Sequence, residues 1–245
     1  MRTVVLIPAR FASTRYPGKP LVKLLGKPMI LWVAELSAKA IGRDNTYVAT
    51  DSEAIANVVS EAGYQAIFTS EEALTGTDRL AEAAEQIDAD IFINVQGDEP
   101  LVCPTDIIKA RDAKLKNMDL VINGFCWLSE DEDVNNVNIP KVITNLENRL
   151  VYISRAPIPG FKDLKNAPRR YKKQVCIYAF TRDELTAFKG FEKKSSLEHC
   201  EDIEILRFFE LGKHVLMIET KPGSLAVDCP EDVANVEAAL SLASL

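Results

Sequence analysis

A short loop near the start of the chain carries several fixed positive charges. The apolar run Thr3–Ile7 predicts a buried strand, Met29–Ala40 predicts a helix, and Arg10, Arg15 and Lys19 lie between them. Three cations in one loop at the edge of a sheet would bind a highly charged anion, of which a triphosphate fits best. The loop contains neither GxxxxGK[ST] nor GxGxxG, so it is not a Walker loop or a dinucleotide-binding loop. A solvated basic loop that ends the strand is the alternative.

Two aspartates follow predicted strands at separate places in the chain. Asp98 comes directly after the apolar run Ile91–Val95 and the pair Gln96-Gly97, which puts its carboxylate at the rim of the sheet, where it could bind a hard divalent cation. Asp228 lies between a later strand and a helix. The alternatives are a turn aspartate at position 98 and a helix N-cap at position 228. If both carboxylates converge with the loop cations, they form the arrangement that a metal–nucleotide reaction needs.

Two further arginines are candidates for the same rim. The segment from Thr75 to Leu80 opens a helix, whose N-terminal backbone donors suit a base edge or an anion. Arg79 either projects to the rim or is a solvated residue of the first turn. Arg155 ends a predicted hairpin strand and could bind a substrate carboxylate through two parallel hydrogen bonds.

The elements that must position these residues alternate in the first half of the chain. The short apolar strands and the capped amphipathic helices predict a doubly wound, Rossmann-like α/β fold with a mostly parallel sheet. Such sheets bind ligands outside the carboxyl ends of their strands. The predicted strands are Thr3–Ile7, Thr46–Ala49, Gln65–Phe68 and Ile91–Val95, and the predicted helices are Met29–Ala40, Glu53–Ala62 and Asp78–Gln86.

The second half predicts an insertion in this fold. We expect a single domain over residues 1–245, with an inserted hairpin lobe at about 126–173 that projects from the sheet as a lid or dimer surface. Residues 159–173 are rich in proline, glycine and basic side chains and predict a mobile connection. The predicted strands are Asp119–Phe125, Lys141–Thr144, Leu150–Ser154, Gln174–Phe180 and His214–Ile218, and the predicted helices are Glu198–Leu211 and Glu231–Leu242.

Composition excludes several classes of partner. The formal net charge of −7 over 245 residues argues against a nucleic-acid groove, although a local basic pocket is compatible with it. The sequence contains no signal-peptide or membrane-span pattern, so we expect no membrane association. Five scattered cysteines without a CxxC pair predict reduced, buried thiols in a cytoplasmic protein.

Motifs along the whole chain resemble those of CMP-sugar synthetases, most closely the 3-deoxy-manno-octulosonate (Kdo) cytidylyltransferases. They occur in the family's order, and the hairpin motif Ser154–Pro157 favours the octulose branch over enzymes that activate nonulosonic acids. The matching segments are Ile7–Arg10, Ser13–Arg15, Pro17–Leu21, Val48–Asp51, Gly76–Leu80, Asn94–Pro100, Ser154–Pro159, Ile177–Tyr178, Leu197–His199 and Val227–Asp228.

The resemblance implies an enzyme that couples CTP to an acidic octulose, giving the CMP-sugar and pyrophosphate for lipopolysaccharide synthesis. It implies Mg²⁺ as cofactor and a homodimer formed through the lobe around residues 140–160. Carried over to this sequence, the catalytic residues are Arg10, Lys19 and Asp98; the nucleotide is bound by Arg10, Ser13, Arg15, Lys19, Thr77 and Arg79; the sugar by Gln96, Arg155, Gln174, Tyr178 and Glu204; and the metal by Asp98 and Asp228.

Three positions on the sugar side depart from the family pattern. Gln174 stands where the family has histidine, Asp202 where an apolar residue is common, and Ile205 where glutamine is usual. The loss of a possible cation and the gain of a carboxylate favour a substrate with a positive group, such as 8-amino-3,8-dideoxy-manno-octulosonate (Kdo8N), over Kdo. Neutral drift at the pocket edge is the alternative. A catalytically inactive nucleotide-binding regulator is the rival from another class, but the intact charged positions argue against it.

Overall fold

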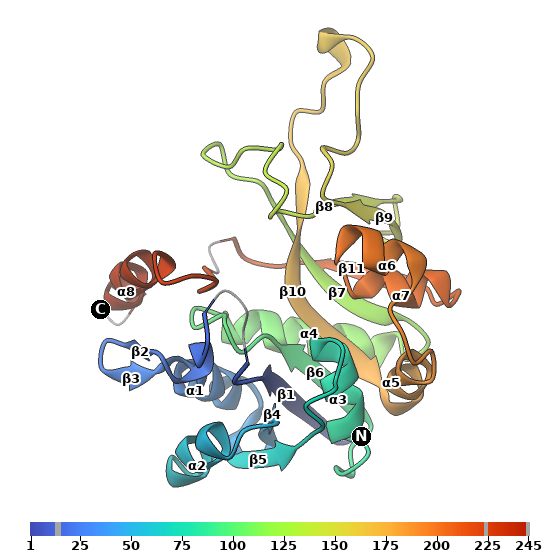
Figure 1. Ribbon diagram of the computed structural model, residues 1–245. Coiled ribbons are helices and arrows are strands. Elements are labelled where there is room, and N and C mark those ends of the chain that lie inside the picture. Colours follow the sequence, from blue (N-terminus) through green and yellow to red (C-terminus); the bar gives the residue numbers. More distant parts are fainter. Residues whose placement is uncertain (13–15, 223–224, 244–245) are drawn as a thin grey trace.

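The chain folds around one large twisted sheet flanked by helices (Figure 1). The computed structural model describes residues 1–12, 16–222 and 225–243. The strands are β1 (Thr3–Ala9), β2 (Lys23–Leu24), β3 (Lys27–Pro28), β4 (Thr46–Thr50), β5 (Gln65–Phe68), β6 (Ile91–Val95), β7 (Val121–Trp127), β8 (Lys141–Thr144), β9 (Leu150–Ser154), β10 (Lys172–Thr181) and β11 (Val215–Glu219). The helices are α1 (Met29–Ile41), α2 (Glu53–Glu61), α3 (Gly76–Ala84), α4 (Pro104–Lys116), α5 (Arg182–Lys189), α6 (Ser196–Glu201), α7 (Ile205–Glu210) and α8 (Asp232–Ala243), with 3-10 turns η1 (Lys19–Leu21), η2 (Arg43–Asn45) and η3 (Leu164–Asn166).

The main sheet has the order β11-β7-β10-β6-β1-β4-β5. The pairs β6–β1, β1–β4, β4–β5 and β7–β11 are parallel, whereas β10 runs antiparallel to both of its neighbours. The prediction of a mostly parallel α/β sheet is therefore confirmed. The carboxyl ends of β1 and β6 meet at one edge, since Leu6 pairs with Asn94.

Helices bury both faces of this sheet, which explains why its strands read as continuous apolar runs. One face packs against α1, α2 and α4 through residues such as Val33, Val59 and Ile107. The opposite face packs against α3, α5 and α7 through residues such as Leu80 and Phe208. β1 and β6 lie between these two cores, so the loops that leave them start from rigid positions.

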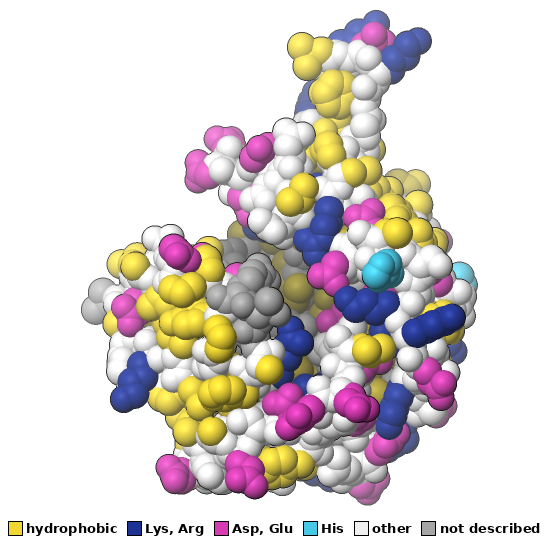
Figure 2. Space-filling model, viewed as in Figure 1, with side chains coloured by type: hydrophobic (Ala, Val, Ile, Leu, Met, Phe, Trp, Pro, Cys, Tyr) yellow, Lys and Arg dark blue, Asp and Glu magenta, His cyan; other side chains and the backbone are white. Residues whose placement is uncertain are grey.

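The predicted hairpin is present as β8–β9, in which Val142 pairs with Ile153. It continues the main sheet, because β8 also pairs with the first residues of β10. Between β9 and β10 the chain extends as a long arm that carries η3 at its tip (Figure 1). Lys and Arg side chains gather at this tip, at the top of Figure 2.

Two helices were absent from the sequence-based prediction, and one predicted helix was wrong. Helices α4 and α5 were not predicted, because α4 buries the charged Lys114 on its inner side and α5 is only 8 residues long. The predicted single helix Glu198–Leu211 is two short helices, because Asp202 adopts a left-handed conformation (φ 50°) that ends α6. This break turns the start of α7 toward the carboxyl edge of the sheet.

No helix among the residues that the structure describes is long and apolar enough to cross a membrane. All five cysteines are free, as expected. The expectation that they are buried was wrong for most of them, because only Cys126 is buried and Cys200 is exposed.

Candidate active site

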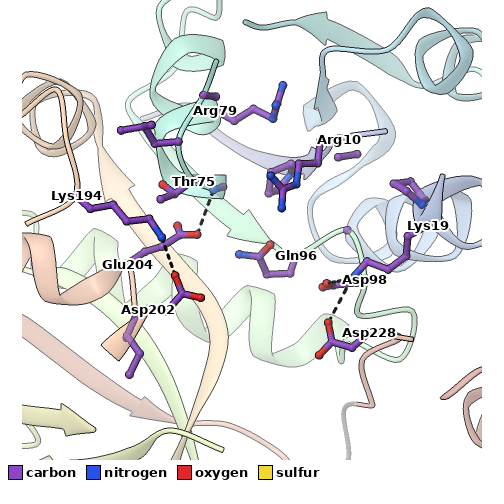
Figure 3. Close-up of a pocket in the computed structure, with 18 of the residues that line it drawn as sticks. Arg10, Lys19, Thr75, Arg79, Gln96, Asp98, Lys194, Asp202, Glu204 and Asp228 are labelled. Atoms are coloured by element: carbon purple, nitrogen blue, oxygen red, sulfur yellow. Dashed lines mark hydrogen bonds and ion pairs between the residues drawn. The ribbon is translucent and has the colours of Figure 1, made fainter. Parts of the chain in front are cut away.

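A cavity of about 440 Å³ opens at the carboxyl ends of β1 and β6, in the position expected for this class of sheet. Loops that leave the sheet form one wall, and the segments around α6 and α7 form the opposite wall (Figure 3). On the outer surface, charged side chains of both signs surround a hollow near the middle of Figure 2. The charged and amide side chains that line the cavity are Arg10, Lys19, Arg79, Gln96, Asp98, Lys194, Glu198, Asp202, Glu204 and Asp228.

Lys19 joins the two aspartates that the sequence placed at strand ends. Its Nζ lies 2.7 Å from Asp98 Oδ2 and 3.4 Å from Asp228 Oδ1. The side chain of Lys19 is only 14% exposed. One loop cation and two carboxylates from distant parts of the chain therefore meet at one point, which fulfils the condition that the sequence left open.

Close backbone packing brings these three side chains together. Gly97 lies so near β1 that an added Cβ would be 2.7 Å from the carbonyl oxygen of Pro8, a distance that a side chain cannot adopt. The amide of Val227 donates to the carbonyl oxygen of Asp98 over 3.0 Å, which joins the two aspartate loops directly. The relative position of the carboxylates is thus fixed by backbone contacts.

The capping alternative for Asp228 does not hold. The carboxylate of Asp232 accepts hydrogen bonds from the backbone amides of Asp228 and Cys229, at 2.8 and 2.9 Å. Asp232 therefore caps this turn, and the carboxylate of Asp228 is directed toward Lys19 instead.

Asp98 and Asp228 fit a hard divalent cation that is shared with a ligand. No cluster of three or more His, Cys, Asp and Glu side chains suited to a metal occurs in the described part of the chain. The two carboxylates supply hard oxygen donors that already converge on one positive charge, the ammonium of Lys19. Magnesium commonly binds through one or two carboxylates, with substrate phosphates and water completing its shell.

The cation loop before Lys19 is described in part. Arg10 is exposed and lines the cavity. The amide of Gly18 donates to the carbonyl oxygen of Phe11 over 2.9 Å, so the two ends of the loop are held together. Ser13 and Arg15, predicted to bind phosphates, lie outside the described residues.

Arg79 is not a solvated residue of the first helical turn. Its side chain is 3% exposed, and its guanidinium donates to Asp51 over 2.8 Å and to the hydroxyl of Thr69. It also lines the cavity. Of the two alternatives for Arg79, projection to the rim is therefore the one the structure supports.

A carboxylate of the protein itself binds the N-terminus of α3, where the sequence suggested the base edge or an anionic group of a ligand. Glu204 accepts hydrogen bonds from the amides of Gly76 and Thr77, at 3.1 and 2.8 Å, and from the hydroxyl of Thr77. Burial raises the pKa of Glu204, and these donors oppose the rise. Glu204 lines the cavity but is committed to α3, and Thr77 is 2% exposed.

Only one of the other predicted sugar-binding residues lines the cavity. Gln96 lines the cavity, whereas Arg155, Gln174 and Tyr178 do not. The Arg155 guanidinium instead donates to the carbonyl oxygens of Val137, Glu201 and Asp202. The expected open position of Arg155 over the rim is thus wrong for this structure, because carbonyls at the end of α6 and in the loop between β7 and β8 engage its donors.

Gln174 and Tyr178 form a pair within the sheet. The Gln174 amide donates to the Tyr178 hydroxyl over 3.2 Å and to Asn123 over 3.0 Å. Burial raises the pKa of Tyr178 well above its usual range. Among the departures from the family pattern, Ile205 is 1% exposed in the core, so its side chain is a packing residue.

Lys194 is a cavity residue that the sequence did not reveal. Its Nζ lies 2.7 Å from the carboxylate of Asp202, on the wall opposite Lys19 (Figure 3). Asp202 thus faces the cavity with its side chain 74% exposed. The only signal in the sequence was the pair Lys193-Lys194 before Ser195, the N-cap of α6. Such a lysine pair usually indicates a solvated surface.

Comparison with known proteins decides the family. The family model described as cytidylyltransferase matches residues 4–215. The chain belongs to the cytidylyltransferase family. It is accordingly a nucleotidyltransferase, and the family resemblance found in the sequence motifs is confirmed.

Individual relatives cover the whole chain. The chain is 40% identical to a 3-deoxy-manno-octulosonate cytidylyltransferase of Syntrophotalea carbinolica, over 98% of this chain and 99% of that protein. It superposes with a TM-score of 0.92 and 34% identity on a solved CMP:2-keto-3-deoxy-manno-octonic acid synthetase complexed with CTP, covering 99% and 100% of the two chains. A 4-diphosphocytidyl-2C-methyl-D-erythritol synthase of Anaerococcus prevotii, at 12% identity and a TM-score of 0.64 over 98% and 99% of the chains, shares the fold.

Proposed function

We propose that this protein transfers the CMP group of CTP to a 3-deoxy-octulosonic acid and releases pyrophosphate. The observation that carries the proposal is the meeting of Lys19, Asp98 and Asp228 beside Arg10 in one cavity of a cytidylyltransferase fold. The names of the full-length relatives support Kdo-type sugars as the acceptor class. The same comparisons support CTP as the nucleotide, since a solved relative of 34% identity binds it.

The residues of the cavity suit phosphoryl-transfer chemistry without a protein nucleophile. The anomeric hydroxyl of the sugar attacks the α-phosphorus of CTP and pyrophosphate leaves, so the protein has to align two substrates and neutralise charge. We assign Arg10 and Lys19 to the phosphates, together with Ser13 and Arg15. We assign Arg79, a residue of α3 that is anchored to Asp51, to the nucleotide as well.

Magnesium is the proposed cofactor, held by Asp98 and Asp228. When bound, it would neutralise phosphate charge and lower the pKa of the attacking hydroxyl. Lys19, whose Nζ lies beside both carboxylates, would bind the phosphates next to this position. Gln96, which follows β6 and faces the cavity, would orient the sugar beside the α-phosphate.

Pyrophosphate release from CTP, measured with Kdo and Mg²⁺, tests this function directly. We expect release that depends on the sugar and stops when the metal is chelated. A folded protein that binds CTP but releases no pyrophosphate with either octulose would instead be the inactive regulatory protein considered above.

We further propose that the preferred sugar is Kdo8N. Asp202 presents a carboxylate to the cavity, and its partner Lys194 is a flexible cation that a substrate ammonium can replace. A charge-assisted contact of this kind contributes roughly 1.5–3 kcal/mol, or about tenfold to a hundredfold in selectivity. Gln174 adds no positive charge where histidine is usual in the family.

A side-by-side measurement of kcat/KM for Kdo8N and Kdo at equal CTP tests the sugar preference. Asp202→Asn should narrow the preference, and Lys194→Gln should widen it because the competing cation is lost. Equal kcat/KM for the two sugars in the unmodified enzyme would show that the departures from the family pattern at Gln174 and Asp202 are neutral drift.

We also propose a homodimer formed through the lobe around residues 140–160, working in the cytoplasm. Among the strands that the structure describes, β9 pairs only with β8, and its residue Val151 is 49% exposed. An apolar sheet edge of this kind is normally covered by another surface. The free cysteines suit a reducing compartment. A monomer by light scattering at micromolar concentration would contradict the dimer.

A further inference from the structure

A buried arginine outside the cavity connects three of the segments that line it. Arg207 lies in α7 with 0% exposure, and it is not among the residues that line the cavity. Its guanidinium donates to Asp78 of α3 over 2.7 and 3.1 Å and to Glu198 of α6 over 2.7 and 2.8 Å. A further bond to the carbonyl oxygen of Phe188 occupies the remaining donor direction. The planar fork of arginine makes such paired contacts, which an ammonium cannot.

Each partner of Arg207 is attached to the cavity wall. Asp78 accepts from the hydroxyl of Thr75 over 2.7 Å, and its own amide donates to that hydroxyl over 3.1 Å. Thr75 is the N-cap of α3 and lines the cavity. Glu198 lines the cavity itself and closes the capping box that starts α6 just after Lys194. One guanidinium therefore sets the distance between two walls.

A second contact from the same turn of α7 acts beside it. Glu204, which precedes α7 and lies three positions before Arg207, holds the amides of Gly76 and Thr77. At Gly76, an added Cβ would lie in van der Waals contact with Gln96 and Glu204, 3.5 Å from each, so the start of α3 adjoins both cavity residues. A small shift of α3 relative to α7 would therefore displace cavity residues that the sequence assigns to nucleotide and sugar.

We infer that Arg207 is a positioning residue for the transfer reaction, which clamps the N-terminus of α3 to α6 and α7 and so holds the substrate cavity in its binding-competent shape. The inference rests on the proposed nucleotide site. It goes beyond the family's reaction, because Arg207 touches no substrate and acts through Asp78 and Glu198. A purely structural ion pair is the alternative, since removing a partner from a buried pair destabilises a protein in any case.

The protein contains a matched control for that alternative. Lys114 and Glu184 form another buried ion pair, at 2.7 Å, between α4 and the first turn of α5. Glu184 exchanges hydrogen bonds with the N-cap Thr181, as Asp78 does with Thr75. Neither Lys114 nor Glu184 lines the cavity. Asp78→Asn and Glu184→Gln thus make the same chemical change at the start of two helices, of which one reaches the site.

The test measures CTP binding by calorimetry and unfolding temperature for the whole enzyme and for Arg207→Lys, Asp78→Asn and Glu184→Gln. We suppose that, without the Arg207 contacts, the cavity adopts its CTP-binding shape about a tenth of the time. The dissociation constant for CTP then rises about tenfold. We expect this rise in the Arg207 and Asp78 variants, and a change of less than about twofold in Glu184→Gln at a similar loss of unfolding temperature.

The outcomes separate the inference from the proposed function. Unmodified enzyme that does not bind CTP contradicts the proposed function itself. Unmodified enzyme that binds CTP, with folded Arg207→Lys and Asp78→Asn variants binding it as tightly, overturns the inference. A rise in all three variants that follows the loss of unfolding temperature also overturns it, because general destabilisation would then explain the effect.

Discussion

Replacement of Lys19 by methionine should strengthen divalent-metal binding in the absence of nucleotide while it weakens catalysis. The ammonium of Lys19 lies 2.7 Å from Asp98 and 3.4 Å from Asp228, in the place where a metal would be held. Metal binding to the free enzyme must therefore displace Lys19 from both carboxylates. Methionine keeps most of the apolar stem and removes the competing charge.

The size of the effect follows from the exposure of the three side chains. Lys19 is 14% exposed, Asp98 28% and Asp228 45%, so solvent screens both ion pairs in part, and it screens the pair with Asp228 more strongly. The shorter, hydrogen-bonded contact is worth about 1.5 kcal/mol, and the longer one a few tenths of a kcal/mol. Their sum of roughly 2 kcal/mol corresponds to a metal affinity about tenfold to thirtyfold higher in Lys19→Met.

Titration of the nucleotide-free protein with Mn²⁺, followed by paramagnetic resonance, measures this affinity. Asp98→Asn is the control, which should bind Mn²⁺ more weakly than the unmodified enzyme. In turnover assays, Lys19→Met should raise the apparent KM for CTP. Equal or weaker Mn²⁺ binding by Lys19→Met would refute the view that Lys19 occupies the metal position.

Further predictions concern the loops and the buried carboxylate. Asp98→Ala or Asp228→Ala should lower kcat/KM for CMP transfer by a factor of roughly a hundred or more, because each removes a charged ligand; undiminished turnover of either would contradict the two-aspartate assignment. Gly97→Ala should lower the free energy of unfolding by about 1–3 kcal/mol, as seen by denaturant titration, because its Cβ would lie 2.7 Å from the carbonyl oxygen of Pro8. Burial raises the pKa of Glu204, so stability from this group is complete below the ordinary glutamate pKa and is lost as pH rises through the folded value. Glu204→Gln lacks this loss, so the difference in unfolding temperature between the variant and the unmodified enzyme should favour the variant more at pH 8 than at pH 5. The same difference at both pH values would show that the pKa of Glu204 is not raised.

Local sequence determined the strands and the chemistry at their ends. Continuous apolar runs such as Thr3–Ile7 and Ile91–Val95 predicted buried parallel strands, because period and length are properties of neighbouring residues. Polar residues that directly follow a parallel strand lie at the carboxyl edge of the sheet, whatever position the strand has in the sheet order. Lys19 and Asp98 could therefore be placed at the rim from the sequence, whereas the position of Asp228 beside them is a result of the tertiary structure.

Tertiary structure alone decided which partners the remaining charged residues have. Arg155 reads as an open ligand for a carboxylate, yet it binds the carbonyls that end α6. Glu204 and Arg207 read as one face of a continuous helix, yet the left-handed Asp202 breaks that helix and turns both residues toward α3.

The physical reason is the range of the interactions. Helical and strand periodicity are set by residues a few positions apart, whereas Arg207 and Asp78 are 129 positions apart and meet only when α3 and α7 pack on the same face of the sheet. The local sequence around a charged residue does not predict whether a carboxylate from a distant part of the chain will be buried beside it. The sequence by itself thus predicted which edge of the sheet carries the candidate site. The tertiary structure decided which contacts hold the opposite wall of the cavity, around α6 and α7.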